Sequence, residues 1–224
     1  MDIHMPQPLA RVHPTLGFEL ANGNLVHTPE MALAVTGVIN LWAQIDQSNA
    51  FLLSQISGSE PVITSAMLQT LTSAEAKKRA ILAAAKAACS HDEYALIRAT
   101  LERFTASRNH RNDFAHHLWG RLNTRDDCVI LADPKVVAAY TAATTSWIRN
   151  RTGTRPDIDR NQVMVWTLRD FEIALEDARE AHGSITRLPL SIGRPPSQNP
   201  MQAQLLTDPK IRRLYDRYLV EKNI

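Results

Sequence analysis

Apolar side chains recur every three or four positions along most of the chain, which is the spacing of amphipathic helices. The first such stretch, Met31 to Ile56, predicts a long helix. Glycine and proline are absent from Val62 through Trp119, which leaves room for two or three further helices. A later stretch, Leu168 to Leu188, repeats the helical spacing. The pattern therefore predicts a mainly α fold.

Short polar signals mark where these helices begin. Thr72 with Glu75 and Ser90 with Glu93 have the spacing of capping boxes, which predicts helices starting near Ser73 and His91. We expect the second of these helices to continue to Trp119.

Later helix starts follow the same logic. Asp133-Pro134 reads as an N-cap followed by proline in the first turn and predicts a helix to about Asn150. Thr167 is a plausible cap for the stretch that follows it, and Asp208-Pro209 predicts an amphipathic C-terminal helix.

The helical spacing of apolar residues stops after Gly120. There the segment "RLNTRDDCVILAD" combines a polar turn with a short β-branched run, which predicts a small hairpin. The expected fold is an up-and-down helical bundle of four to six helices with a small β-hairpin insertion. Its expected layout is an N-terminal arm (1–28), the bundle (29–190), and a linker with a C-terminal helix that packs on the bundle or on a partner (191–224).

Composition narrows the class of protein only a little. Hydrophobic residues make up 44% and charged residues 21% of the chain, as in ordinary globular domains. The formal charge of +2 excludes neither nucleic acid nor a neutral partner. Two cysteines are too few for a disulfide framework, and neither a signal peptide nor a membrane-spanning stretch is visible. We therefore expect a soluble cytoplasmic protein.

One segment concentrates the candidate chemistry, "SRNHRNDFAHHLWG" at 107–120. Arg108 and Arg111 occupy seam positions where helix packing favours apolar residues. At about 100° per residue, Asn112, His116 and Trp119 fall on the same arc as the two arginines. The set suits a phosphate, because arginine offers a charged planar fork and histidine exchanges protons near neutral pH.

The segment "RNDFAH", residues 111–116, resembles the RNxxxH form of the R-x4-6-H motif of the HEPN superfamily. That resemblance implies a helical bundle, commonly a homodimer, and in many members a metal-independent endoribonuclease. It also implies that Arg111, Asn112 and His116 are catalytic and line a cleft at the dimer interface. His117 also satisfies the looser spacing from Arg111, so either histidine could be that of the motif.

The predicted function is cleavage of RNA through attack of the 2′-hydroxyl, without metal or cofactor. Arg108, His117 and Trp119 are the expected substrate-binding residues. RNA, a second copy of the chain, and an antitoxin or other regulatory partner are the expected partners, which suggests a role in defence or in a toxin–antitoxin pair. The alternatives are a non-catalytic nucleotide-binding, RNA-binding or interaction module, and an oligomeric scaffold whose charged arc is merely solvated.

Other candidate residues have weaker support. Asp113, His116 and His117 have helical spacing that could hold zinc, but no fourth ligand is evident. Cys89 has no obvious base nearby and is expected to be inert. Asp157 and Asp159 partly neutralise a group of arginines that could bind a nucleic-acid backbone. The group consists of Arg149, Arg151, Arg155 and Arg160. No P-loop, dinucleotide-binding or hydrolase-elbow motif is present.

Overall fold

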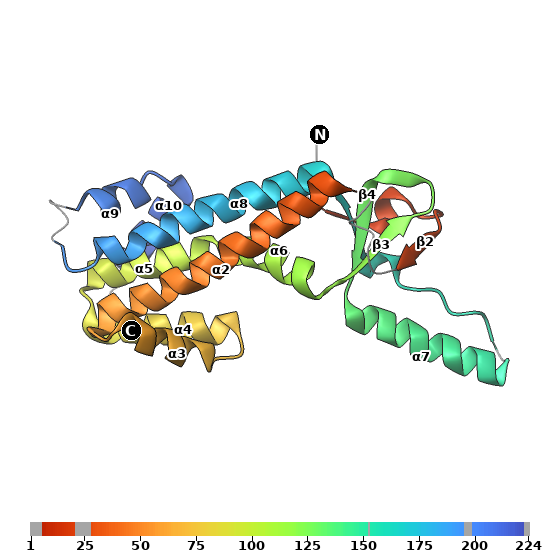
Figure 1. The fold of residues 1–224 in the computed structure, drawn as a ribbon, viewed down its shortest axis with the longest axis horizontal. Coiled ribbons are helices and arrows are strands. Elements are labelled where there is room, and N and C mark those ends of the chain that lie inside the picture. The colour runs from red at the N-terminus through yellow and green to blue at the C-terminus, as the bar shows by residue number, and fades with distance from the viewer. Residues whose placement is uncertain (1–5, 21–27, 152, 195–198, 222–224) are drawn as a thin grey trace. The chain divides into compact units, whose positions relative to one another are not determined.

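The computed structural model describes residues 6–20, 28–151, 153–194 and 199–221, so parts of the predicted N-terminal arm and linker lie outside the described residues. The fold is mainly helical, as predicted, with one small antiparallel sheet (Figure 1). The chain divides into two compact units, the first made of residues 1–39 and 109–176 and the second of 40–108 and 177–224. Three helices contribute residues to both units: α2 (Pro29–Ser57), α6 (Thr105–His116) and α8 (Leu168–Arg187).

The first unit is built around a five-stranded antiparallel sheet. Its order is β1 (Gln7–Pro8), β5 (Val163–Thr167), β4 (Arg125–Ala132), β3 (Leu118–Leu122), β2 (Phe18–Leu20). Strands β3 and β4 form the predicted hairpin, so that prediction is confirmed. The prediction of a lone inserted hairpin is wrong, because strands from distant parts of the sequence pair with both of its edges.

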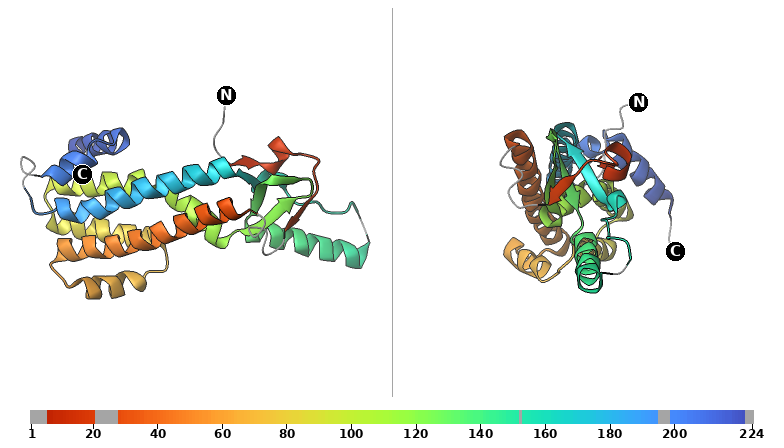
Figure 2. Two further views of the ribbon diagram at one scale, coloured as in Figure 1. Left: turned by 45° about the horizontal axis from the view of Figure 1, so that its top comes forward. Right: turned by 90° about the vertical axis from the view of Figure 1, so that its right-hand side faces the viewer.

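One face of this sheet packs against helix α7 (Pro134–Asn150), which starts where the sequence predicts. The Asp133 side chain caps α7 by accepting a hydrogen bond from the Lys135 amide at 2.8 Å. Val136, Val137 and Tyr140 pack on a cluster that includes alternate residues of β4 and β5. Helices α1 (Leu9–Val12) and η2 (Arg160–Gln162) flank the same region. Figure 1 and Figure 2 show α7 on one side of the strands.

The second unit is helical in its described residues. Besides its parts of the shared helices it contains α3 (Pro61–Gln69), α4 (Ala74–Ala88), α5 (His91–Arg103), η3 (Leu188–Ser191), α9 (Pro200–Leu205) and α10 (Pro209–Val220). The predicted C-terminal helix, α10, packs along α5. The buried Tyr215 and Tyr218 carry this contact, and their hydroxyls donate hydrogen bonds to Asp92 and Glu102 of α5.

Two predictions about helix boundaries require correction. The cap of α4 is Ser73, whose hydroxyl accepts from the Ala76 amide at 3.1 Å, and Thr72 is not part of a capping box. The capping box of Ser90 and Glu93 is present as predicted. Adjacent hydroxyl residues offer the same acceptor chemistry, so the sequence pattern alone cannot choose between them.

The second correction concerns the helix expected to run from His91 to Trp119. It is broken at Phe104, whose backbone (φ −102°, ψ 14°) ends α5, and α6 begins at Thr105. Helix α6 ends at His116, and Trp119 lies in β3. The break falls at the end of the apolar seam: Phe104 is buried, and the next two seam positions are Arg108 and Arg111.

Gly120 provides a test of the sheet. A Cβ atom at this position would lie 2.4 Å from the Glu19 carbonyl oxygen of β2 and 2.8 Å from Ile130 Cγ1 of β4. We expect Gly120→Ala to lower the free energy of unfolding by about 1–3 kcal/mol, because both neighbouring strands must shift. Urea denaturation would measure the change.

Gly183→Ala is the matched control, because a Cβ there meets the flexible end of Arg187 at 3.2 Å within α8. Removing this helical glycine should leave stability unchanged or raise it by about 0.5–1 kcal/mol. Equal effects of the two substitutions would contradict a close approach at Gly120.

Candidate functional site

The end of α6 is held in the first unit by aromatic rings. Phe114 is 3% exposed, and its ring centroid lies 4.8 Å from that of Trp166 on β5 and 5.2 Å from that of Phe171 on α8. The Trp119 indole stacks on Phe171 at 6.0 Å and donates a hydrogen bond to the Phe114 carbonyl oxygen. These contacts join the helix end to strand β3 and fix its orientation.

Strand alternation explains how the cluster forms. In the sheet register Trp119 is opposite Leu131, and Val129 is opposite Trp166, so these residues share the face away from α7. Alternate residues of β4 face the cluster beneath α7, and all five residues from Cys128 to Ala132 are buried. The sheet is therefore covered on both faces within this unit.

Arg111 and Asn112 lie together on the exposed side of this helix end. Arg111 Nη1 donates a hydrogen bond to Asn112 Oδ1 at 3.2 Å, and both side chains are half-buried. The bond restricts the guanidinium, and its other donors form no hydrogen bond or ion pair with the described residues. The two residues therefore form a positioned cationic group.

His116 and His117 have different surroundings. His116 is the last residue of α6, is exposed, and lies one turn after Asn112. His117 is half-buried, and its Nε2 lies 3.6 Å from Asp113 Oδ1. Within the described part of the chain, no hydrogen bond or ion pair joins Arg111 to either histidine.

The sequence offers Asp113 only as a possible metal ligand, and the structure places its carboxyl beside histidines instead. Burial raises the pKa of its carboxyl, opposed by attraction to His117 and His110, and repulsion from Asp133 adds to the rise. His110 also contacts the edge of the Trp166 ring, with centroids 5.4 Å apart. The i, i+4 spacing of Asp113 and His117 was the available sequence signal for this pair.

Arg108 is assigned to the second unit, unlike the other predicted site residues. Its guanidinium lies 5.7 Å from the centroid of the Trp42 ring. Burial lowers the pKa of this guanidinium, and attraction to Asp46 and Glu75 partly offsets the effect. Stacking on an indole explains how an arginine occupies a seam position in the helix.

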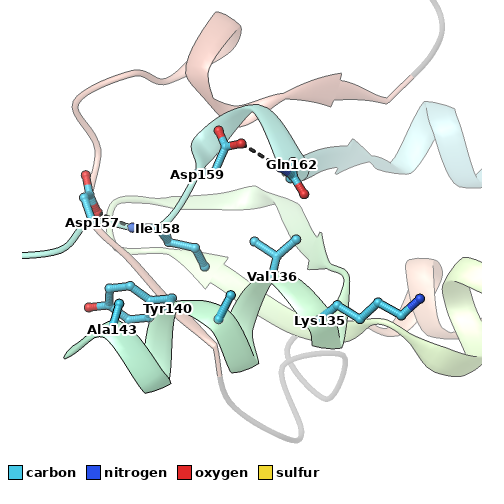
Figure 3. Close-up of a pocket in the computed structure, with 9 residues that line it drawn as sticks. Lys135, Val136, Tyr140, Ala143, Asp157, Ile158, Asp159 and Gln162 are labelled. Atoms are coloured by element: carbon cyan, nitrogen blue, oxygen red, sulfur yellow. Dashed lines mark hydrogen bonds between the residues drawn. The ribbon is translucent and has the colours of Figure 1, made fainter. Parts of the chain in front are cut away.

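A pocket of about 390 Å³ lies elsewhere in the first unit, between α7 and the segment before β5 (Figure 3). Val136, Tyr140 and Ile158 give it mostly apolar walls. Its two carboxylates are engaged locally: Asp157 accepts from the Ile158 amide, and Asp159 accepts from the Gln162 side chain. None of the RNxxxH residues lines this pocket, so we do not treat it as part of the candidate site.

Metal and thiol chemistry find little support in the described residues. Among them, no group of three or more His, Cys, Asp or Glu side chains is placed to hold a metal ion. Burial raises the pKa of Cys89 to about 11, so the reactive thiolate is scarce at neutral pH. This agrees with the interpretation of Cys89 as an inert thiol.

No family model, curated protein or solved structure gives a significant match to the chain. The described helices also include none with the length and apolar character needed to cross a membrane.

Asp113 provides a test of the electrostatics at the helix end. A raised carboxyl pKa means that the folded state favours the protonated form. The contribution of this carboxyl to the free energy of unfolding is therefore greatest below its ordinary pKa of 3.8. That contribution is lost as the pH rises through the raised pKa of the folded state. We expect Asp113→Asn to abolish this loss, so that the variant gains stability relative to wild type as pH rises above about 4.

Urea denaturation at a series of pH values would measure the effect, with Asp126→Asn on the exposed part of β4 as the matched control. Loss of the pair with His117 should subtract no more than about 1 kcal/mol, since both side chains are partly exposed. Parallel curves for wild type and Asp113→Asn would contradict the assigned burial.

Proposed function

We propose that the protein is a metal-independent endoribonuclease of the HEPN type, with the end of α6 as its catalytic element. The observation that carries this proposal is the presentation of the RNxxxH residues on a helix end held by aromatic packing. Catalytic groups must keep their positions to within a fraction of an ångström, and a packed helix meets this requirement better than a loop.

In the proposed reaction, the ribose 2′-oxygen attacks the adjacent phosphorus while His116 accepts the hydroxyl proton. The O2′–P bond forms and the P–O5′ bond breaks. Arg111, restricted by Asn112, neutralises charge that builds on the non-bridging oxygens. A second histidine, supplied by a partner copy, donates a proton to the departing 5′-oxygen. The products are a 2′,3′-cyclic phosphate and a 5′-hydroxyl.

We assign the proton acceptor to His116 because its ring is exposed, whereas His117 is paired with Asp113. An Asp–His pair holds a ring in one orientation, which suits His117 to substrate binding beside the reaction centre. Trp119 supports the site through its contacts with Phe114 and Phe171, and its ring edge is the proposed contact for a base.

The proposal includes a homodimer. Arg111 and His116 are five residues apart, so they differ by about 140° around the axis and about 7.5 Å along it. In the dimer that we propose, two α6 ends lie against each other across a two-fold axis so that Arg111 of one copy is beside His116 of the other. The up-and-down bundle, the cytoplasmic location and an antitoxin or other regulatory partner belong to the same proposal.

A cleavage assay tests the catalytic assignment. Labelled single-stranded RNA is incubated with the pure protein in EDTA, and the ends of the products are identified by mass. We expect His116→Ala and Arg111→Ala each to slow cleavage by about 10²–10⁴-fold, since they remove the proton acceptor and the charge stabilisation. His117→Ala should slow it much less.

Asn109→Ala is the matched control. Asn109 follows Arg108 as Asn112 follows Arg111, lies on the same helix and is exposed, so its loss should leave the rate unchanged. Equal cleavage by wild type, Arg111→Ala and His116→Ala would refute the assignment. RNA binding without cleavage by the wild type would instead support a non-catalytic RNA-binding module.

A further inference from the structure

Helix α7 is longer than its packing in the first unit requires. Its N-terminal half is anchored through Val136, Val137 and Tyr140, yet no residue of the helix is fully buried. The helix continues for ten residues beyond Tyr140, and most of these are exposed. Figure 1 and Figure 2 show the C-terminal end of α7 lying away from the strands. This end therefore adds little to the core.

The same end carries a concentrated positive charge. The stretch from Pro134 to Pro156 contains four basic residues and no acidic residue. Three of the four, Arg149, Arg151 and Arg155, lie at or just beyond the helix end and are exposed. Within the described part of the chain, none of the three forms an ion pair.

The acidic residues that follow are already engaged. Asp157 Oδ2 lies 3.7 Å from Arg160 Nε, and Arg160 also donates to the Leu16 carbonyl oxygen at 2.8 Å. Asp159 accepts hydrogen bonds from the Asn161 amide and from the Gln162 side chain. Arg160 is thus held by an ion pair and a hydrogen bond, whereas the three exposed arginines make no ion pair with any described residue.

An indole lies beside one of these arginines. The Arg151 guanidinium carbon lies 5.5 Å from the centroid of the Trp147 ring, and Trp147 Nε1 donates to the Gly153 carbonyl oxygen at 3.3 Å. Arg151 adopts a left-handed conformation (φ 52°) that ends the helix. A non-glycine residue in that conformation carries a steric cost, and the chain turns away from the helix axis at this point.

We propose that these four residues, Trp147, Arg149, Arg151 and Arg155, form a binding surface for single-stranded RNA, here called the α7 tip. Arginine forks match phosphate oxygens, and a guanidinium beside an indole offers a flat surface for stacking an unpaired base. An acidic protein would use the charge but not the flat surface, so RNA fits the surface better. This inference rests on the proposed function, because it names how the RNA substrate is held away from the reacting phosphate.

Binding is measured in a His116→Ala background, so that it does not depend on cleavage. Fluorescence anisotropy with a labelled single-stranded RNA compares the parent with a variant that combines Arg149→Ala, Arg151→Ala and Arg155→Ala. We expect Kd to rise at least tenfold at low salt. The slope of log Kd against log salt should fall by about 2, since each phosphate contact on a single strand contributes about 0.7.

The matched control combines Lys210→Ala, Arg212→Ala and Arg213→Ala on α10, which removes the same charge from exposed positions of the second unit. Its Kd should stay within twofold of the parent. A third variant has lysine at the three arginine positions of the tip, which keeps the charge and removes the planar guanidinium donors. Its slope of log Kd against log salt should be unchanged, while its Kd rises. Circular dichroism checks that each variant is folded.

Several outcomes would overturn the inference: an unchanged Kd in the tip variant, equal losses in the tip and α10 variants, or displacement of RNA by polyglutamate as readily as by polyuridylate. The last would indicate an acidic protein partner. The three tip substitutions are also made in a protein that keeps His116. If that variant cleaves RNA with the kcat and KM of the wild type, the α7 tip is refuted as an RNA-binding surface and the proposed function stands. Tip-dependent binding by a protein that never cleaves RNA would refute the proposed function and leave the tip in place.

Discussion

The packing of Phe114 against Trp166 and Phe171 is the contact on which the candidate site depends. Phe114 lies within the RNxxxH segment, between the arginine and the histidine, and it is the buried residue of that segment. Aromatic rings bury a large apolar area in preferred geometries, so they fix a helix end in angle as well as in depth. Without this contact, Arg111, Asn112 and His116 would lie on a helix end that frays.

The residues that contact Phe114 show what the sheet contributes to the site. The rings that hold Phe114 come from β5 and from the start of α8, and Trp119 comes from β3. The hairpin alone would leave β4 unpaired on one side, and its residues are apolar on both faces. Strand β5 pairs with the free edge of β4 and β2 with the free edge of β3, while α7 covers one face and the ends of α6 and α8 cover the other. The sheet is therefore the support for the polar end of α6.

Charge is distributed between two different settings in the first unit. At the end of α6, Arg111 donates a hydrogen bond to the Asn112 amide oxygen and Asp113 lies beside His117, and all four side chains are half-buried. At the α7 tip the arginines are exposed and form no ion pair within the part of the chain that the structure describes, and Arg151 lies beside the Trp147 indole. Groups of the first kind are positioned for chemistry, and groups of the second kind are available to a long polyanion. The proposed ribonuclease would use both.

The sequence by itself determined the features that depend on neighbouring residues. Helix starts at Asp133-Pro134, at Ser90 with Glu93 and at Asp208-Pro209 follow from side chains that cap adjacent backbone amides, and the hairpin follows from a turn between β-branched runs. Only the tertiary structure decided that Phe104 breaks the helix, that Trp119 is in a strand and that the hairpin is the centre of a sheet. Those outcomes depend on burial against residues far away in the chain, such as Trp166 and Phe171, and a local pattern carries no information about which distant surface will cover it.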